Sequence, residues 1–255
     1  MTTTPKLKKL ESKQIRNHLK YLKLPFITAN YEAMAQEASQ RNWGHVDYFA
    51  RLIEGEASTR SDRATQRRIQ AARFPVIKTI DGFQWSWPKT INRLQIQNLL
   101  RMVFIQEKAN VIFLGGVGMG KTHLASAIGH AACLKGYKVL YTTAIDAINT
   151  LNAAQAAGRL KPALNRLLKP DLLILDELGY LPIDKSGADL LFQIFSHRYE
   201  QGSMIITSNR AYKDWAKIFN NDATLTSAIL DRLLHHAETV LIEGKSYRMK
   251  GRIEE

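Results

Sequence analysis

The sequence feature that most constrains the fold is a glycine-rich loop between a strand pattern and a helix pattern. The loop has Gly at its first and sixth places, followed by Lys and Thr, and reads Gly115-Gly116-Val117-Gly118-Met119-Gly120-Lys121-Thr122. This is the spacing of a phosphate-binding P-loop. An apolar run at 111–114 precedes it and helical spacing follows at 123–128, which is the strand–loop–helix context that the motif requires. We therefore predict a nucleotide-binding loop.

Each residue type in this loop has a role that phosphate chemistry can use. The glycines let backbone N–H groups surround phosphate oxygens, and the start of the helix adds positive potential. Lys121 is expected to reach the β- and γ-phosphates, and Thr122 to give its hydroxyl to Mg²⁺. The predicted nucleotide-binding residues are Gly115, Gly116, Val117, Gly118, Met119, Gly120, Lys121, Thr122 and His123. The alternative is a plain glycine turn.

Composition favours a basic, globular protein with a polyanionic partner. The formal net charge is +13, and a charge of this size favours nucleic acid before a membrane. The sequence contains no apolar run close to the roughly 20 residues that cross a bilayer, and no secretory signal pattern. Cys133 is the only cysteine, so an intramolecular disulfide is impossible and we expect a cytoplasmic protein.

Residues 1–73 are predicted to form a basic helical domain. They hold 14 Lys and Arg against 7 Asp and Glu, a balance of 14 − 7 = +7. We expect Pro25 to end the first helix, Thr28 to cap the second, and the third to follow Gly44. The third helix should turn four apolar side chains inward: Val46, Phe49, Leu52 and Ile53. Such a domain could bind a nucleic-acid backbone or a partner protein.

An aromatic linker at 74–90 and an ATPase domain at 91–255 are predicted to follow. The linker either folds over the adenine ring or covers the core. After a helix at 90–104, the patterns alternate between strand and helix, so we predict an α/β fold with a parallel five-stranded sheet. Strands are expected at 111–114, 138–142, 171–175, 203–207 and 239–242. Helices are expected at 121–134, 144–157, 186–201, 212–219 and 225–236.

Two further strands end in polar residues that suit nucleotide hydrolysis. The apolar strand at 172–175 runs into Asp176 and Glu177, at the sheet edge where nucleotide chemistry sits. Asp176 is expected to hold Mg²⁺ and Glu177 to act as the general base; the alternative is an acidic strand end without catalytic role. The next strand ends at Asn209, which could sense the γ-phosphate or could merely begin a turn.

These motifs, in this order, resemble an AAA+ ATPase. More closely, Leu-Asp-Glu-Leu-Gly-Tyr-Leu-Pro at 175–182 and Arg-Tyr-Glu-Gln-Gly-Ser-Met-Ile-Ile-Thr-Ser-Asn at 198–209 resemble the IstB-type helper ATPases of bacterial insertion sequences, relatives of the DnaC helicase loaders. The resemblance implies ATP hydrolysis with Mg²⁺, binding of double-stranded DNA, self-assembly into a homo-oligomer with ATP sites between subunits, and cooperation with a transposase of the same element.

The resemblance also assigns roles near the end of the sequence. Arg232 becomes the candidate arginine finger for a neighbouring subunit, unless it only pairs with Asp231 on one helix. Arg248 is a weaker candidate for a late sensor. AAA+ proteins usually continue into a helical lid, but only 13 residues (255 − 242) follow Ile242, so we expect no full C-terminal lid and do not assume a hexameric ring.

Several other functions remain to be weighed. A replicative helicase loader would use the same ATPase chemistry with a different partner, and a structural DNA-binding protein would bind nucleotide without turnover. A GTPase lacks its guanine-reading segment here, and a small-molecule kinase would not explain the basic domain. The basic stretch at 158–169 could contact DNA or form a solvated helix face. No His/Cys cluster has zinc-ligand spacing, and we expect adjacent His235 and His236 not to share one helix face.

Overall fold

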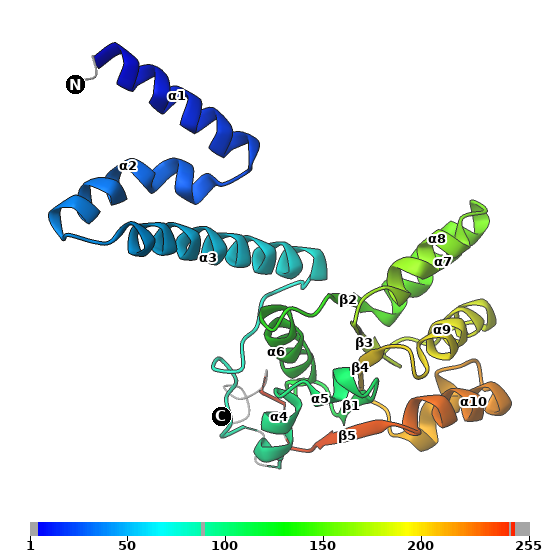
Figure 1. The fold of residues 1–255 in the computed structure, drawn as a ribbon. Coiled ribbons are helices and arrows are strands. Elements are labelled where there is room, and N and C mark those ends of the chain that lie inside the picture. Colours follow the sequence, from blue (N-terminus) through cyan, green and yellow to red (C-terminus); the bar gives the residue numbers. More distant parts are fainter. Residues whose placement is uncertain (1–4, 88–89, 245, 248–255) are drawn as a thin grey trace. The chain divides into compact units, whose positions relative to one another are not determined.

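The computed structural model describes residues 5–87, 90–244 and 246–247. The chain divides into two compact units, Met1–Gln66 and Arg67–Glu255. The first unit contains only helices, and the second contains the sheet with helices on both of its faces (Figure 1). No helix among the described residues is long and apolar enough to span a lipid bilayer.

The first unit is built from α1 (Pro5–Tyr21), α2 (Pro25–Gln40) and α3 (His45–Ala72) as far as Gln66. The three predicted helices form, but two boundary assignments are wrong. Pro25 opens α2 instead of ending α1, because the first turn of a helix needs no proline N–H. Thr28 lies inside α2, where its hydroxyl donates to the Leu24 carbonyl at 2.6 Å, so it is not the cap.

A buried carboxylate joins α2 to α3. Glu56, which is 5% exposed, accepts the backbone N–H groups of Phe26 and Ile27 at 2.8 and 3.2 Å. These donors belong to the first turn of α2 and would otherwise lack partners. The predicted inward face of the third helix is wrong except at Leu52, which is buried, whereas Val46 is 79% exposed.

The second unit contains the predicted parallel five-stranded sheet, in the order β2-β3-β4-β1-β5. The strands are β1 (Asn110–Gly115), β2 (Val139–Thr143), β3 (Leu172–Leu178), β4 (Ser203–Ser208) and β5 (Ala237–Ile242). Strands β1, β3 and β4 are buried over most of their length and carry apolar side chains on both faces, which is typical of a parallel sheet covered by helices. The predicted α/β fold class is confirmed.

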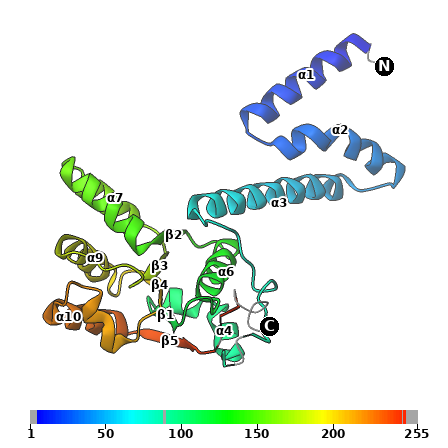
Figure 2. The same ribbon diagram turned by 180° about the vertical axis from the view of Figure 1, so that it is seen from behind.

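Helices cover the sheet on both faces, as Figures 1 and 2 show. They are α4 (Arg93–Leu99), α5 (Val103–Gln106), α6 (Lys121–Leu134), α7 (Ala144–Ala156), α8 (Leu160–Leu168), α9 (Lys185–Arg198), the 3₁₀ helix η1 (Tyr212–Lys217) and α10 (Ala223–Leu234). Two apolar clusters result. One cluster packs α4, α5 and α6 against the sheet and includes the fully buried Ile128. The other cluster packs α7, α9 and α10 and includes the fully buried Leu191.

The single helix predicted at 90–104 is in fact two short helices. Asn92 caps α4 by accepting the Gln95 N–H at 3.1 Å, and Met102 adopts a positive φ of 66° that breaks the helix before α5. This break changes which side chains face the core. Leu94 is 64% exposed, whereas Ile96 is fully buried.

Candidate active site

The sheet order places three strand ends side by side. Strands β3, β4 and β1 are consecutive neighbours and all run in the same direction. Their carboxyl ends therefore meet at one edge, which is where parallel α/β sheets bind ligands. The P-loop follows β1 at this edge, Asp176 and Glu177 lie near the end of β3, and Asn209 follows β4.

The P-loop wraps around the side chain of its own lysine. Lys121 is 3% exposed, and its Nζ donates to the carbonyls of Gly115 and Gly116 at 2.7 Å each. Gly120 has a φ of 91°, and a Cβ on it would lie 2.7 Å from the Phe83 ring. The sixth residue of the motif is therefore required to be glycine both by its backbone conformation and by close packing.

Asp176 lies at the centre of a hydroxyl network. The carboxylate is 1% exposed; its Oδ1 accepts Thr122 Oγ1 at 3.1 Å and also the Thr207 hydroxyl, and its Oδ2 accepts Tyr141 Oη at 2.5 Å. Burial and the bond to Asp176 raise the pKa of the Tyr141 phenol, so this group remains a donor at neutral pH. Hydroxyl and carboxylate oxygens are the ligands that Mg²⁺ prefers.

Sequence patterns missed two members of this network. We gave neither Tyr141 nor Thr207 a role beside Asp176 from the sequence alone. The register explains their place: Thr143 of β2 lies opposite Asp176 on β3, so Tyr141 lies on the strand beside the carboxylate. A tyrosine within the strand Val139–Thr143, whose other residues are Val, Leu and Thr, was the only available signal, and it became informative only once β2 and β3 were known to be neighbours.

Glu177 points away from Asp176 because the backbone changes direction between them. Its φ is 62°, and the pairing of β3 with β4 shifts register between Leu175 and Leu178. The Glu177 N–H donates to the Thr207 hydroxyl at 3.0 Å, which fixes this bulge. A bulge re-aims side chains, and here it leaves the Glu177 side chain exposed on the wall of a cavity.

Asn209 carries a buried acceptor that lacks a partner among the described residues. Its Oδ1 makes no hydrogen bond there, although the Ser208 hydroxyl just before it donates to the Leu178 carbonyl at 2.7 Å. A buried acceptor without a partner is costly. The side chain is therefore suited to contact a water molecule or ligand at the strand edge.

A cavity of about 520 Å³ opens beside the P-loop, within the usual size of ligand pockets. One wall is the P-loop from Gly118 through His123, and the opposite wall includes Phe83 and Trp87 of the linker. His123 Nε2 donates a hydrogen bond to the Thr79 carbonyl at 2.9 Å, and its ring lies edge-on to Phe83. Phe83 is also part of the apolar cluster that packs against α6, so the linker covers the core, and its folding over a bound base stays a prediction.

The remaining predicted residues lie elsewhere. Arg232 is on α10, where its Nη1 donates to the Ala228 carbonyl at 2.9 Å and its guanidinium lies 5.2 Å from the centre of the Phe192 ring. Within the described part of the chain it forms no ion pair with Asp231. Arg248 lies outside the described residues. Tyr247 donates its N–H to the Gly118 carbonyl at 3.0 Å, so this residue lies against the P-loop.

The fold and this sheet edge define a P-loop α/β domain of the AAA+ class. Two solved structures are similar to it. AMPPCP-bound DnaA from Aquifex aeolicus has a TM-score of 0.55 and 25% sequence identity, over 70% of this chain and 54% of that chain. The DnaC helicase loader has a TM-score of 0.52 and 24% sequence identity, over 69% of this chain and 98% of that chain. The second likeness shows the fold alone.

The family follows from the sequence comparisons. Residues 17–255 match the IstB-like ATP binding proteins. The insertion sequence IS5376 putative ATP-binding protein of Geobacillus stearothermophilus is 39% identical over 93% of this chain and 94% of its own length. The chain therefore belongs to the IstB-like ATP binding protein family, whose members are found in insertion sequences.

Proposed function

We propose that this protein is an ATPase that assembles on duplex DNA in an ATP-dependent manner and recruits or activates a transposase. The observation that carries the ATPase role is the contact between the Thr122 hydroxyl and the Asp176 carboxylate, 3.1 Å apart, with Glu177 on the wall of the adjoining cavity. Two separate segments of the chain supply these three groups, and each group has a distinct task in nucleotide hydrolysis.

Each residue of the site has its own role in ATP hydrolysis. Lys121 exchanges its two carbonyl partners for the β- and γ-phosphate oxygens, and Thr122 and Asp176 hold Mg²⁺. When bound, Mg²⁺ neutralises phosphate charge in the transition state. Glu177 accepts a proton from the attacking water. Asn209, with its unpartnered Oδ1, orients that water and contacts the γ-phosphate.

ATP controls assembly if a neighbouring subunit completes each site. Arg232 is half-buried on α10, and in our proposal its guanidinium extends from one subunit to the γ-phosphate bound by the next. A positive charge at that point stabilises the transition state. Nucleotide would then favour one arrangement of subunits, and hydrolysis would release it.

Duplex DNA is the proposed polyanionic partner. Helix α8 and its flanks expose four basic side chains: Arg159, Lys161, Arg166 and Lys169. Two of them, Arg166 and Lys169, line a groove of about 1230 Å³. Lys138 and Glu177 line the same groove. Lysine and arginine neutralise DNA phosphates without reading sequence. DNA held here would lie close to the hydrolytic site.

The first unit offers a surface for the partner protein. On α3, Val46 and Phe49 are 79% and 61% exposed, and Ile53 is 44% exposed. Their spacing of three and four residues puts them on one helix face, and an exposed apolar face marks a protein-binding surface. We therefore assign transposase binding to this face of α3. A helicase in place of transposase is the second candidate, because the DnaC loader shares the fold.

Electron microscopy of the protein with ATP, with and without duplex DNA, tests assembly directly. We expect ordered oligomers that require both ATP and DNA, and no such oligomers with Lys121→Ala, which should lose ATP binding. Assembly that is identical with any nucleotide would contradict the proposal. Pull-down with the transposase and with a replicative helicase separates the two partners; Phe49→Asp should abolish capture of the correct one.

A further inference from the structure

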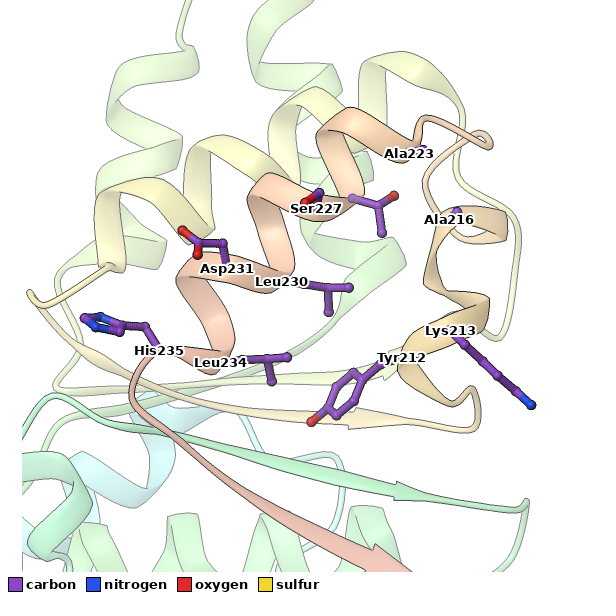
Figure 3. A pocket seen from close by; sticks show the side chains of 10 residues that line it. Tyr212, Lys213, Ala216, Ala223, Ser227, Leu230, Asp231, Leu234 and His235 are labelled. Carbon is purple, nitrogen blue, oxygen red and sulfur yellow. The ribbon is translucent and has the colours of Figure 1, made fainter.

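A group of metal-ligating side chains lies at the sheet edge opposite the P-loop. Glu200 is in the turn between α9 and β4, and His235 and His236 are in the turn between α10 and β5. One ligand atom from each of these three side chains lies within 4.8 Å of the other two. Figure 3 shows His235 at the end of α10, directed away from Tyr212.

The end of α10 makes this grouping possible. We expected adjacent histidines to point to different helix faces, but α10 ends at Leu234, so that argument does not apply to His235 and His236. Their ring centroids are 4.1 Å apart at an interplanar angle of 45°. The His236 carbonyl accepts the Asn110 N–H at 2.7 Å, which ties this turn to the start of β1 and gives the pair a rigid base.

The hydrogen bonds of the cluster favour a metal-binding tautomer. Tyr199 Oη lies 2.8 Å from His235 Nδ1, and the two rings stack at 5.9 Å. If Nδ1–H donates to this oxygen, Nε2 is left with a free lone pair, the arrangement typical of metal-bound histidine. Glu200 Oε1 lies 3.7 Å from His236 Nε2, a separation that a cation between them can bridge.

We propose that Glu200, His235 and His236 form a zinc site. Two imidazoles and one carboxylate with an open fourth position are a recurring ligand set for Zn²⁺. The side chains of His236 and Glu200 are 52% and 54% exposed, so water or a group from another molecule occupies the fourth position. The site is separate from the Mg²⁺ position at Asp176, because β4 and β5 begin at this edge and end at the other.

Bound zinc would join two turns that are far apart in the sequence. Glu200 follows α9, and the histidines follow α10, which carries Arg232. A cation across these turns would hold the two helix ends together and would stabilise only the folded state. The expected consequence is an increase in Tm of about 5–10 °C at 100-fold excess of Zn²⁺ over Kd.

Equilibrium dialysis of the full chain, without a polyhistidine tag, measures the site. We expect the wild type to bind one equivalent of Zn²⁺. The double variant His235→Ala/His236→Ala should lose this binding, with a drop in affinity of at least about 100-fold. Substitution with Co²⁺ should give the visible absorption bands of a four-coordinate site. His197→Ala is the matched control, since His197 is exposed and bonds only to the Gln193 carbonyl at 2.8 Å.

Two further variants test the assigned geometry. Tyr199→Phe should weaken Zn²⁺ binding about 10-fold as an outer partner of His235, and Glu200→Gln should change the Co²⁺ spectrum. All of these side chains are on the surface, so the apo variants should keep the wild-type Tm. No zinc uptake by the wild type, or equal uptake by the double variant, would overturn the proposal.

Discussion

At the scale of single residues, Asp176 and Glu177 are neighbours in sequence but lie in opposite environments. Asp176 is almost fully buried and accepts three hydroxyl hydrogen bonds, whereas Glu177 is exposed at a positive φ. A buried, fully hydrogen-bonded carboxylate is held in one orientation, which suits a metal ligand. An exposed carboxylate keeps access to water, which suits a general base.

Glu177→Gln separates binding from hydrolysis. The amide cannot accept a proton from water, so phosphate release should fall by about 100-fold or more, while ATP affinity stays within about 2-fold because the Lys121 cradle is untouched. Steady-state phosphate release and titration with a fluorescent ATP analogue measure the two effects. Normal phosphate release would remove Glu177 from its assigned role.

Tyr141→Phe tests the hydroxyl network. The variant removes the donor at 2.5 Å from Asp176 Oδ2 and leaves the ring in place, so the fold should remain intact. Outer partners of metal ligands typically affect metal affinity by 10- to 100-fold, and we expect the Mg²⁺ concentration for half-maximal ATPase activity to rise about 10-fold. Tyr137→Phe, on a tyrosine outside this network, serves as the control. An unchanged Mg²⁺ dependence would contradict the assignment.

At the scale of elements, one buried guanidinium connects α9 with the segments before β3 and β4. Arg198 is 1% exposed, and it donates to five backbone carbonyls, those of Leu167, Leu168, Pro170, Asp171 and Ser203. Burial lowers its pKa to about 10, so it remains charged at neutral pH. The rigid fork of arginine donors suits several carbonyls at once.

Arg198→Met should strongly destabilise the second unit. Five carbonyls would lose the guanidinium as donor, although the Asp171 carbonyl would keep the Ser203 N–H at 3.2 Å. Each buried acceptor left without a partner is expensive, so we expect a loss of about 3 kcal/mol or more in the free energy of unfolding. Urea unfolding followed by circular dichroism provides the measurement. Arg166→Met, at an exposed position, is the control and should change stability by less than about 0.5 kcal/mol. Similar losses in both variants would exclude this role for Arg198.

At the scale of the whole molecule, the positive charge is shared between both units. The net charge is +13. Residues 1–66 hold 11 Lys and Arg against 7 Asp and Glu, which gives 11 − 7 = +4, and residues 67–255 contribute the remaining 13 − 4 = +9. A charge spread along the chain in this way gives sequence-independent attraction to a polyanion. Nucleotide-dependent assembly would add many such subunits along one duplex.

DNA binding should therefore weaken steeply with salt. If each subunit neutralises about four phosphates, affinity per subunit should fall about 100-fold between 50 and 200 mM salt, because counterions are released on binding. Fluorescence anisotropy with a labelled duplex measures the slope. Lys161→Glu/Arg166→Glu should flatten it, whereas Asp189→Lys, on α9, should not. A salt-independent affinity would count against the basic-surface argument.

Local sequence patterns were sufficient for the P-loop α/β fold but not for every helix boundary. All five strands and the P-loop helix form where their apolar periodicity predicts, because a buried parallel strand must be apolar along its whole length. The prediction of a single helix at 90–104 was wrong, because Asn92 and Met102 interrupt that range through local backbone conformations that apolar spacing does not reveal. Likewise, the apolar face at Val46 predicts burial only if another element is present to cover it.

The sequence by itself determined the nucleotide-binding loop, the acidic strand end and the family, because these depend on residue types at short, fixed spacing. Only the tertiary structure decided which distant side chains meet. Tyr141 reaches Asp176 because β2 and β3 are neighbours, and Glu200 reaches His235 and His236 because two turns share one edge of the sheet. Contacts of this kind depend on strand order and on where a helix ends, which no local pattern encodes.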